Sequence, residues 1–182
     1  MKKKTIHVLS VVAILATLTM GVAACGTSSA DAPVELPASE MNLETKTDTS
    51  TELSQSEIDA LEMALDDEYK AWSTYQAVID KFGDVRPFVN IIGAEESHIA
   101  ALKTLFERYG LDVPENEWVG NVPEFDTVND ACHGGVDAEI ENGALYDELF
   151  SMIEHDDILE VFHNLRDASL EQHLPAFERC AR

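Results

Sequence analysis

The chain has 182 residues, of which 35 are acidic and 12 are lysine or arginine, so its formal net charge is −23. Hydrophobic residues make up 45% of it, which is enough for one packed core and too many for a disordered chain. Nucleic acid is disfavoured as a partner, because phosphate contacts need clustered lysine and arginine. The negative charge suits cations or simply keeps the protein soluble.

The first 24 residues have the pattern of an export signal. Three lysines at positions 2–4 precede an uncharged, largely apolar stretch over residues 5–24, which is typical of a secretory signal peptide. A membrane-spanning anchor is the alternative, but hydroxyl residues interrupt the stretch and no basic residue follows it directly. The stretch ends in Val-Ala-Ala-Cys, which resembles the lipobox of bacterial lipoproteins.

The lipobox implies that Cys25 is acylated and becomes the first mature residue. The protein is then exported and held at a bacterial membrane surface by its lipid, without spanning the membrane. Residues 25–53 are rich in Ser, Thr, Ala, Pro and acids and show no apolar period, which predicts a disordered tether. The folded domain is expected over residues 54–182.

Apolar spacing in this domain predicts four helices and no strand. Ser54 and Glu57 have the spacing of a capping box at the start of the first helix. A short turn over 128–133 and the pair Gly134-Gly135 are expected before the third helix, and Pro175 is expected to kink the fourth. The predicted helices are 54–82, 87–109, 136–153 and 157–180, with a long crossover over 111–127. Two antiparallel hairpins joined by such a crossover form an all-α four-helix bundle of the ferritin-like arrangement.

Several acids and histidines fall on the apolar faces of these helices. Glu95 and His98 form a Glu-x-x-His pair one helical turn apart, on the side that carries Ile91 and Leu102. Burying a carboxylate and an imidazole there is costly unless something neutralises or coordinates them, and a metal ion does so. One such pair is weak evidence, because it occurs often by chance on solvated faces.

Other residues strengthen the metal hypothesis. Glu68 lies seven residues before Tyr75 in the first helix, and Glu139 lies seven residues before Tyr146 in the third, so the two hairpins repeat one pattern. His173 follows Glu139 by a spacing similar to that between Glu68 and His98. The pattern favours Glu139 over Glu141 as the candidate ligand, because Glu141 lies on the same helix face as Glu148 and is expected to be solvated. A buried histidine satisfied by a carbonyl or an acid is the alternative.

A second Glu-x-x-His pair competes with the first. Glu160 and His163 complete the motif only a few residues into the fourth helix, near one end of the expected bundle. They are interpreted as surface residues or as a separate site.

Four stretches together resemble an uncharacterised bacterial ferritin-like domain family, a distant relative of rubrerythrin and bacterioferritin. The resemblance covers about residues 53–182, and the stretches that carry it are 66–70, 94–102, 145–147 and 173–177. Such relatives hold two metal ions, usually iron, between four carboxylates and two histidines. The resemblance implies metal ligands at Glu68, Glu95, His98, Glu139 and His173, with Tyr75 and Tyr146 as hydrogen-bond partners of the ligands.

One position departs from the family pattern. Leu170 stands three residues before His173, where the relatives have a glutamate, so the sixth ligand is missing unless Glu171 reaches in through a bulged turn. The four-cysteine rubredoxin-like module of rubrerythrins is also absent from the sequence.

Two cysteines, Cys132 and Cys180, remain once Cys25 is assigned to the lipid anchor. An even number of remaining cysteines is typical of an exported protein with disulfide bonds. They lie at neighbouring ends of the antiparallel third and fourth helices, which predicts a disulfide between them.

The sequence therefore predicts an exported, membrane-tethered ferritin-like protein that binds one or two ions of iron, or of manganese or zinc, in its core. Two ions would permit oxidase or peroxidase chemistry of the di-iron type. The alternative is a non-catalytic interaction or scaffold lipoprotein that keeps the fold without metal.

Overall fold

The computed structural model describes residues 52–182. The predicted signal peptide, the lipidated Cys25 and nearly all of the tether therefore lie outside the described residues. All regular secondary structure in residues 52–182 is helical, which confirms the all-α class. None of the helices found in this part of the chain has both the length and the hydropathy needed to cross a membrane.

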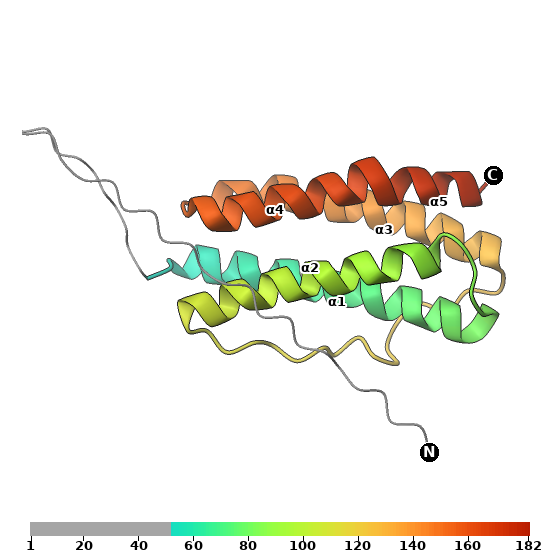
Figure 1. The fold of residues 1–182 in the computed structure, drawn as a ribbon, viewed down its shortest axis with the longest axis horizontal. Helices are drawn as coiled ribbons and strands as arrows, with labels where there is room; N and C mark the ends of the chain where they lie inside the picture. Colours follow the sequence, from blue (N-terminus) through green and yellow to red (C-terminus); the bar gives the residue numbers. More distant parts are fainter. Residues whose placement is uncertain (1–51) are drawn as a thin grey trace, which may run out of the picture. The chain divides into compact units, whose positions relative to one another are not determined.

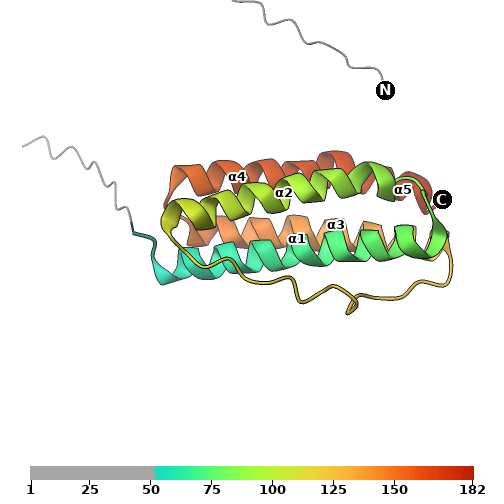
Figure 2. The same cartoon turned by 60° about the horizontal axis from the view of Figure 1, so that its bottom comes forward.

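The first two helices form an antiparallel hairpin. α1 (Gln55–Phe82) and α2 (Phe88–Tyr109) lie side by side and are joined by a short turn (Figure 1). An extended segment over residues 110–127 then runs back along the bundle, so that the next helix starts at the end where α1 finishes (Figure 2).

The second hairpin begins with α3 (Val128–Leu149), followed by a 3₁₀ turn over Phe150–Met152. The returning rod is made of α4 (Asp156–Ala168), a π-helical turn over Ser169–His173 and α5 (Leu174–Cys180) (Figure 1). The described chain is thus a bundle of two helical hairpins joined by a long connection.

Local sequence explains the ends of α1. The Oγ of Ser54 accepts the N–H of Glu57 at 3.3 Å, and the Glu57 carboxylate accepts the N–H of Ser54 at 2.9 Å, so the predicted capping box is confirmed. At the other end Gly83 has a φ of +83°, which only glycine adopts without a steric penalty.

The predicted start of the third helix at residue 136 is wrong, because α3 already begins at Val128. A Cβ atom on Gly134 would lie 2.5 Å from the ring of Phe125, and one on Gly135 would lie 2.4 Å from the ring of Phe177. The two glycines therefore lie inside α3, where they allow aromatic rings to approach the helix backbone. They do not mark the end of a turn before the helix, which is what the sequence predicted. The predicted end at residue 153 is also late, since α3 gives way to the 3₁₀ turn at Phe150.

The fourth rod changes its geometry next to Pro175. The N–H of Leu174 bonds to the carbonyl of Ser169, five residues back, instead of to a carbonyl four residues back. Proline has no N–H for the helical ladder, so the turn before it is where the ladder is interrupted. The π-helical turn holds one extra residue, which shifts the residues on its two sides relative to each other.

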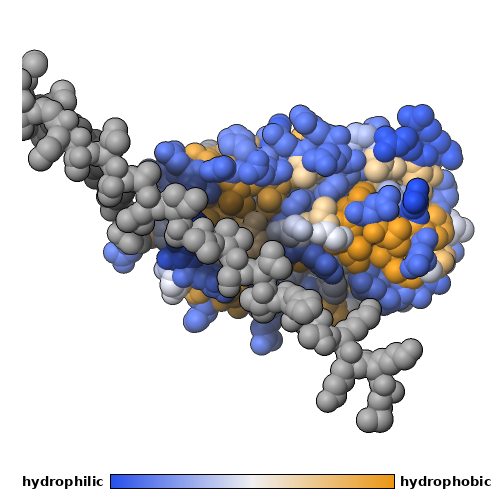
Figure 3. Space-filling view, in the orientation of Figure 1, coloured by the Kyte–Doolittle hydropathy of each residue, from blue (hydrophilic) through white to orange (hydrophobic). Residues whose placement is uncertain are grey.

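Buried residues form two apolar clusters with a polar layer between them. The bundle has four rods, which are α1, α2, α3 and the unit of α4, the π-helical turn and α5. Along the sequence of each rod, the buried polar residues lie between residues of one apolar cluster and residues of the other. Glu57 lies outside this layer, and the buried polar residues within it are Glu68, Ser73, Glu95, His98, Glu139, Asn142, Ser169 and His173. By contrast, Figure 3 shows hydrophilic residues over much of one face of the bundle, interrupted by apolar areas.

Cys132 and Cys180 lie within disulfide-bonding distance, with their Cα atoms 5.6 Å apart. The predicted pairing is therefore confirmed. It fastens the start of α3 to the end of α5.

Glu57 also holds the two hairpins together at one end. Its second carboxylate oxygen accepts the N–H groups of Glu154 at 3.0 Å and His155 at 3.1 Å, and lies 2.6 Å from the His155 ring. Burial opposes its charge, but the hydrogen bonds from His155, Glu154 and Ser54 outweigh burial and lower the pKa of Glu57 to about 2.

We expect Gly135→Ala to destabilise the fold by about 1–3 kcal/mol, because the added methyl group meets the buried Phe177 ring. Gly93→Ala is the matched control, since a Cβ there meets nothing within 4 Å and α2 should gain about 0.5–1 kcal/mol. Urea unfolding of both variants measures the two effects. Equal stability of the two variants would contradict this packing role of Gly135.

We expect Glu57→Gln to cost about 1.5–3 kcal/mol at neutral pH, the range for hydrogen bonds to a charged group. The folded-state pKa of about 2 lies below the ordinary 4.5, so the stabilisation is complete above pH 4.5 and is lost as pH falls toward 2. Urea unfolding of wild type and variant across this pH range should show the stability difference shrinking. A difference that stays constant down to pH 2 would contradict the assignment.

Candidate metal centre

All five predicted ligands lie together in the polar layer. Glu68 comes from α1, Glu95 and His98 from α2, Glu139 from α3 and His173 from the π-helical turn, so every rod contributes. Each carboxylate residue is at most 2% exposed, and the two histidines are 9% and 4% exposed. The helical spacing that singled out these residues therefore brings them to one place.

The five side chains form two groups that share Glu95. In the first, His98 Nδ1 lies 3.1 Å from Glu68 Oε2 and 3.0 Å from Glu95 Oε2. In the second, His173 Nδ1 lies 3.2 Å from Glu95 Oε1 and 3.5 Å from Glu139 Oε2. The ligand atoms within each group lie within 4.8 Å of one another, close enough to meet one ion. The two oxygens of Glu95 thus face different groups.

Two tyrosines bond to the outer carboxylates across the hairpins. Tyr75 of the first hairpin donates its O–H to Glu139 Oε1 at 2.6 Å, and Tyr146 of the second donates to Glu68 Oε1 at 2.8 Å. Burial and the adjacent carboxylate raise the pKa of both phenols well above 10, so both stay neutral donors. The predicted contacts of Tyr75 and Tyr146 with the candidate ligands are confirmed.

The carboxylates keep both imidazoles protonated at neutral pH in the metal-free protein. Burial opposes their charge, but the neighbouring carboxylates outweigh burial and raise the pKa of His98 to about 10 and of His173 to about 9. Burial raises the pKa of Glu68, whereas the two neighbouring imidazoles outweigh burial and lower the pKa of Glu95. A cation entering the site would replace these two protons.

The fourth rod supplies no second ligand besides His173. Leu170 points toward α3, where its side chain would lie 2.5 Å from a Cβ on Gly143. Glu171 is exposed, so it does not supply the missing ligand, although a π-helical turn is present. Ser169 is buried instead and donates its Oγ–H to Asn142 Oδ1 at 2.7 Å.

Asn142 and Asp67 are residues of the site that the sequence did not single out. The Asn142 amide donates to Glu68 Oε1 at 3.3 Å and to Asp67 Oδ2 at 2.8 Å. Burial raises the pKa of Asp67 to about 6 despite this bond. Asn142 follows Glu139 by one helical turn, and this spacing is the signal that could have pointed to it.

The competing motif does not form a comparable cluster. Glu160 and His163 are exposed, and the His163 ring stacks on Phe150 with centroids 4.1 Å apart. Among residues 52–182, the groups of acids, histidines and cysteines that could share an ion do not include them. Glu141, expected to be solvated, is 69% exposed and pairs with Lys70 at 3.6 Å.

The chain is therefore an all-α bundle with a buried cluster of glutamates and histidines. No protein-family model matches it, and no curated protein does. A solved structure is similar to it, the crystal structure of hypothetical protein MJ0754 from Methanococcus jannaschii DSM 2661, with a TM-score of 0.64. The sequences are 24% identical, over 71% of this chain and 81% of that chain. At this identity the similarity shows a shared fold alone.

We expect Tyr75→Phe and Tyr146→Phe each to destabilise the metal-free protein by about 1–3 kcal/mol, because each leaves a buried carboxylate without its phenol donor. Tyr69→Phe is the control, since its O–H reaches only a backbone carbonyl at 3.2 Å in a less enclosed place, and should cost about 1 kcal/mol or less. Urea unfolding in the presence of a chelator measures all three. Equal losses would contradict a special role of the two phenols.

Proposed function

We propose that this chain is an exported ferritin-like protein, held at a membrane through Cys25, that binds iron or a similar divalent metal in its core. The observation that carries the proposal is the position of Glu95, whose two oxygens each complete a separate group of buried ligand atoms. A carboxylate in that position can bridge two ions. Solubility alone gives no reason to bury three glutamates in the middle of a core.

The donor set fits such a metal. His173 Nδ1 is buried and has no hydrogen-bond partner among the described residues. A buried polar atom usually has such a partner, and a metal ion would take its place here. Carboxylate oxygens with imidazole nitrogens suit iron, manganese and zinc. Glu68 with His98 would hold one ion, Glu139 with His173 would hold the other, and Glu95 would contribute to both.

The surrounding residues would prepare the ligands. Tyr75 and Tyr146 hold one oxygen of the two outer carboxylates, which leaves the other oxygen of each turned toward an imidazole. The two apolar clusters exclude water from both sides of the layer. Bound iron would supply one-electron redox chemistry with oxygen or peroxide, and an oxidase or peroxidase activity of the di-iron type is proposed only for occupancy by two ions.

The metal content of the purified protein after loading with Fe(II) or Mn(II) tests the proposal. We expect Glu95→Gln to lower affinity at both positions by more than tenfold, since even residues that only support metal ligands typically contribute about 10–100-fold. Glu68→Gln and Glu139→Gln each remove a ligand from one group and should leave the other able to bind. Glu96→Gln is the matched control, because Glu96 is the exposed neighbour of Glu95 on α2.

Elemental analysis and equilibrium dialysis give the number of ions bound. An unloaded wild type would defeat the metal proposal and favour the scaffold alternative. Equal binding by Glu95→Gln and Glu96→Gln would show that metal sits elsewhere. One ion per chain would preserve metal binding and remove the support for two-ion redox chemistry.

A further inference from the structure

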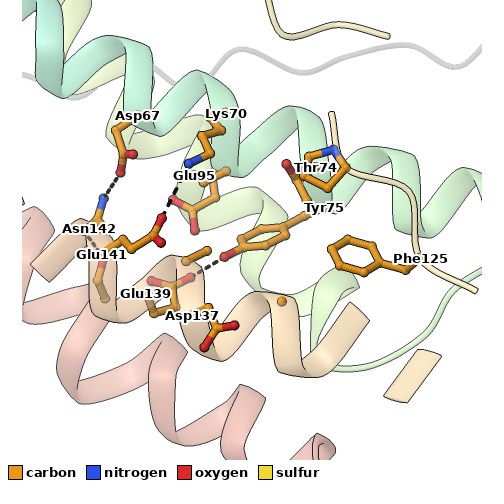
Figure 4. Close-up of a pocket in the computed structure, with 15 residues that line it drawn as sticks. Asp67, Lys70, Thr74, Tyr75, Glu95, Phe125, Asp137, Glu139, Glu141 and Asn142 are labelled. Carbon is orange, nitrogen blue, oxygen red and sulfur yellow. Dashed lines mark hydrogen bonds and ion pairs between the residues drawn. The ribbon is translucent and has the colours of Figure 1, made fainter. Parts of the chain in front are cut away.

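A cavity of about 180 Å³ connects the surface with one side of the buried cluster. It lies between α1, α3 and the crossover segment, with Tyr75 and Phe125 among its walls (Figure 4). Glu95 and Glu139 line its inner end, and both are 2% exposed. Lys70 lines its outer end, where its side chain is 36% exposed.

The cavity carries carboxylates from its mouth to its floor. Glu141 and Asp137 are exposed at the outer end, Asp67 is half-buried, and Glu139 lies at the inner end. The one basic side chain among its lining residues, Lys70, forms an ion pair with Glu141 at 3.6 Å (Figure 4). A series of carboxylates between solvent and a buried site attracts cations and replaces part of their hydration as they move inward.

Apart from the shared Glu95, the cavity is lined by a candidate ligand of only one group, Glu139. Its lining includes Glu95 and Glu139, together with Asn142 and Ser169, and does not include Glu68 or His98. A solute that enters by this path therefore meets the group around Glu139 first. The neutral side chains of Asn142 and Ser169, which are hydrogen-bonded to each other, also line the cavity.

We propose that this cavity is the path by which a divalent cation enters the cluster, and that the Lys70–Glu141 ion pair at its mouth limits the rate of entry. The inference rests on the proposed metal-binding function. Lys70 opposes an incoming cation and occupies the carboxylate that would first receive it. The path predicts changes in the rate of loading that leave the final amount of bound metal unchanged.

Rapid-mixing absorbance with Co(II) as the probe measures loading of the purified protein. Ala138→Phe places a ring in the half-buried wall of the cavity and should slow loading at least tenfold. Ile140→Phe adds a ring on the exposed side of the same helix and should have no effect. Lys70→Gln should speed loading several-fold, whereas Lys103→Gln, which removes the lysine above the Tyr69 ring on another face, should not.

Final cobalt content and helical circular dichroism show whether each variant keeps its fold and site. Normal cobalt content with wild-type rates in both Ala138→Phe and Lys70→Gln would overturn the path alone. Equal slowing by Ala138→Phe and Ile140→Phe would also overturn it. A wild type that binds no cobalt would overturn the proposed function, and the entry path with it.

Discussion

Three carboxylates and two imidazoles share one layer in the middle of this bundle, and burying any of them alone would be strongly unfavourable. The rest of the core is arranged around that layer. Every rod is apolar above and below it, so the two apolar clusters are separate and the polar atoms must satisfy one another. Without metal they do so through imidazolium–carboxylate pairs. With metal, the same oxygens and nitrogens would bind the ion.

The layer also ties the two hairpins together. Tyr75 of the first hairpin bonds to a glutamate of the second, and Tyr146 of the second bonds to a glutamate of the first. At one end Glu57 adds a further link, from the start of α1 to the start of α4. Docking of the hairpins and assembly of the cluster are therefore one event, because each carboxylate completes its hydrogen bonds only when both hairpins are in place.

Local periodicity was enough to predict α1 and α2 and to single out the five clustered residues, since helical spacing places residues on a face without reference to distant contacts. The role of Tyr75 and Tyr146 came from the family resemblance. It failed where the role of a residue depends on contacts with residues far away in the sequence. Gly135 looked like a helix breaker because the Phe177 ring that needs its missing Cβ comes much later in the sequence.

The two halves of the site repeat one pattern but are not equivalent. The first hairpin supplies Glu95 and His98 one turn apart, whereas in the second the residue at the matching position is Leu170, which packs against Gly143. Glu95 must then serve both groups, and among the residues that belong to one group alone, Glu139 is the one that lines the cavity. Three carboxylates carry a charge of −3, which neutralises one divalent ion fully and two only in part. Each group has one glutamate and one histidine of its own besides the shared Glu95, so the two halves of the site carry matching ligands and differ in their access to solvent.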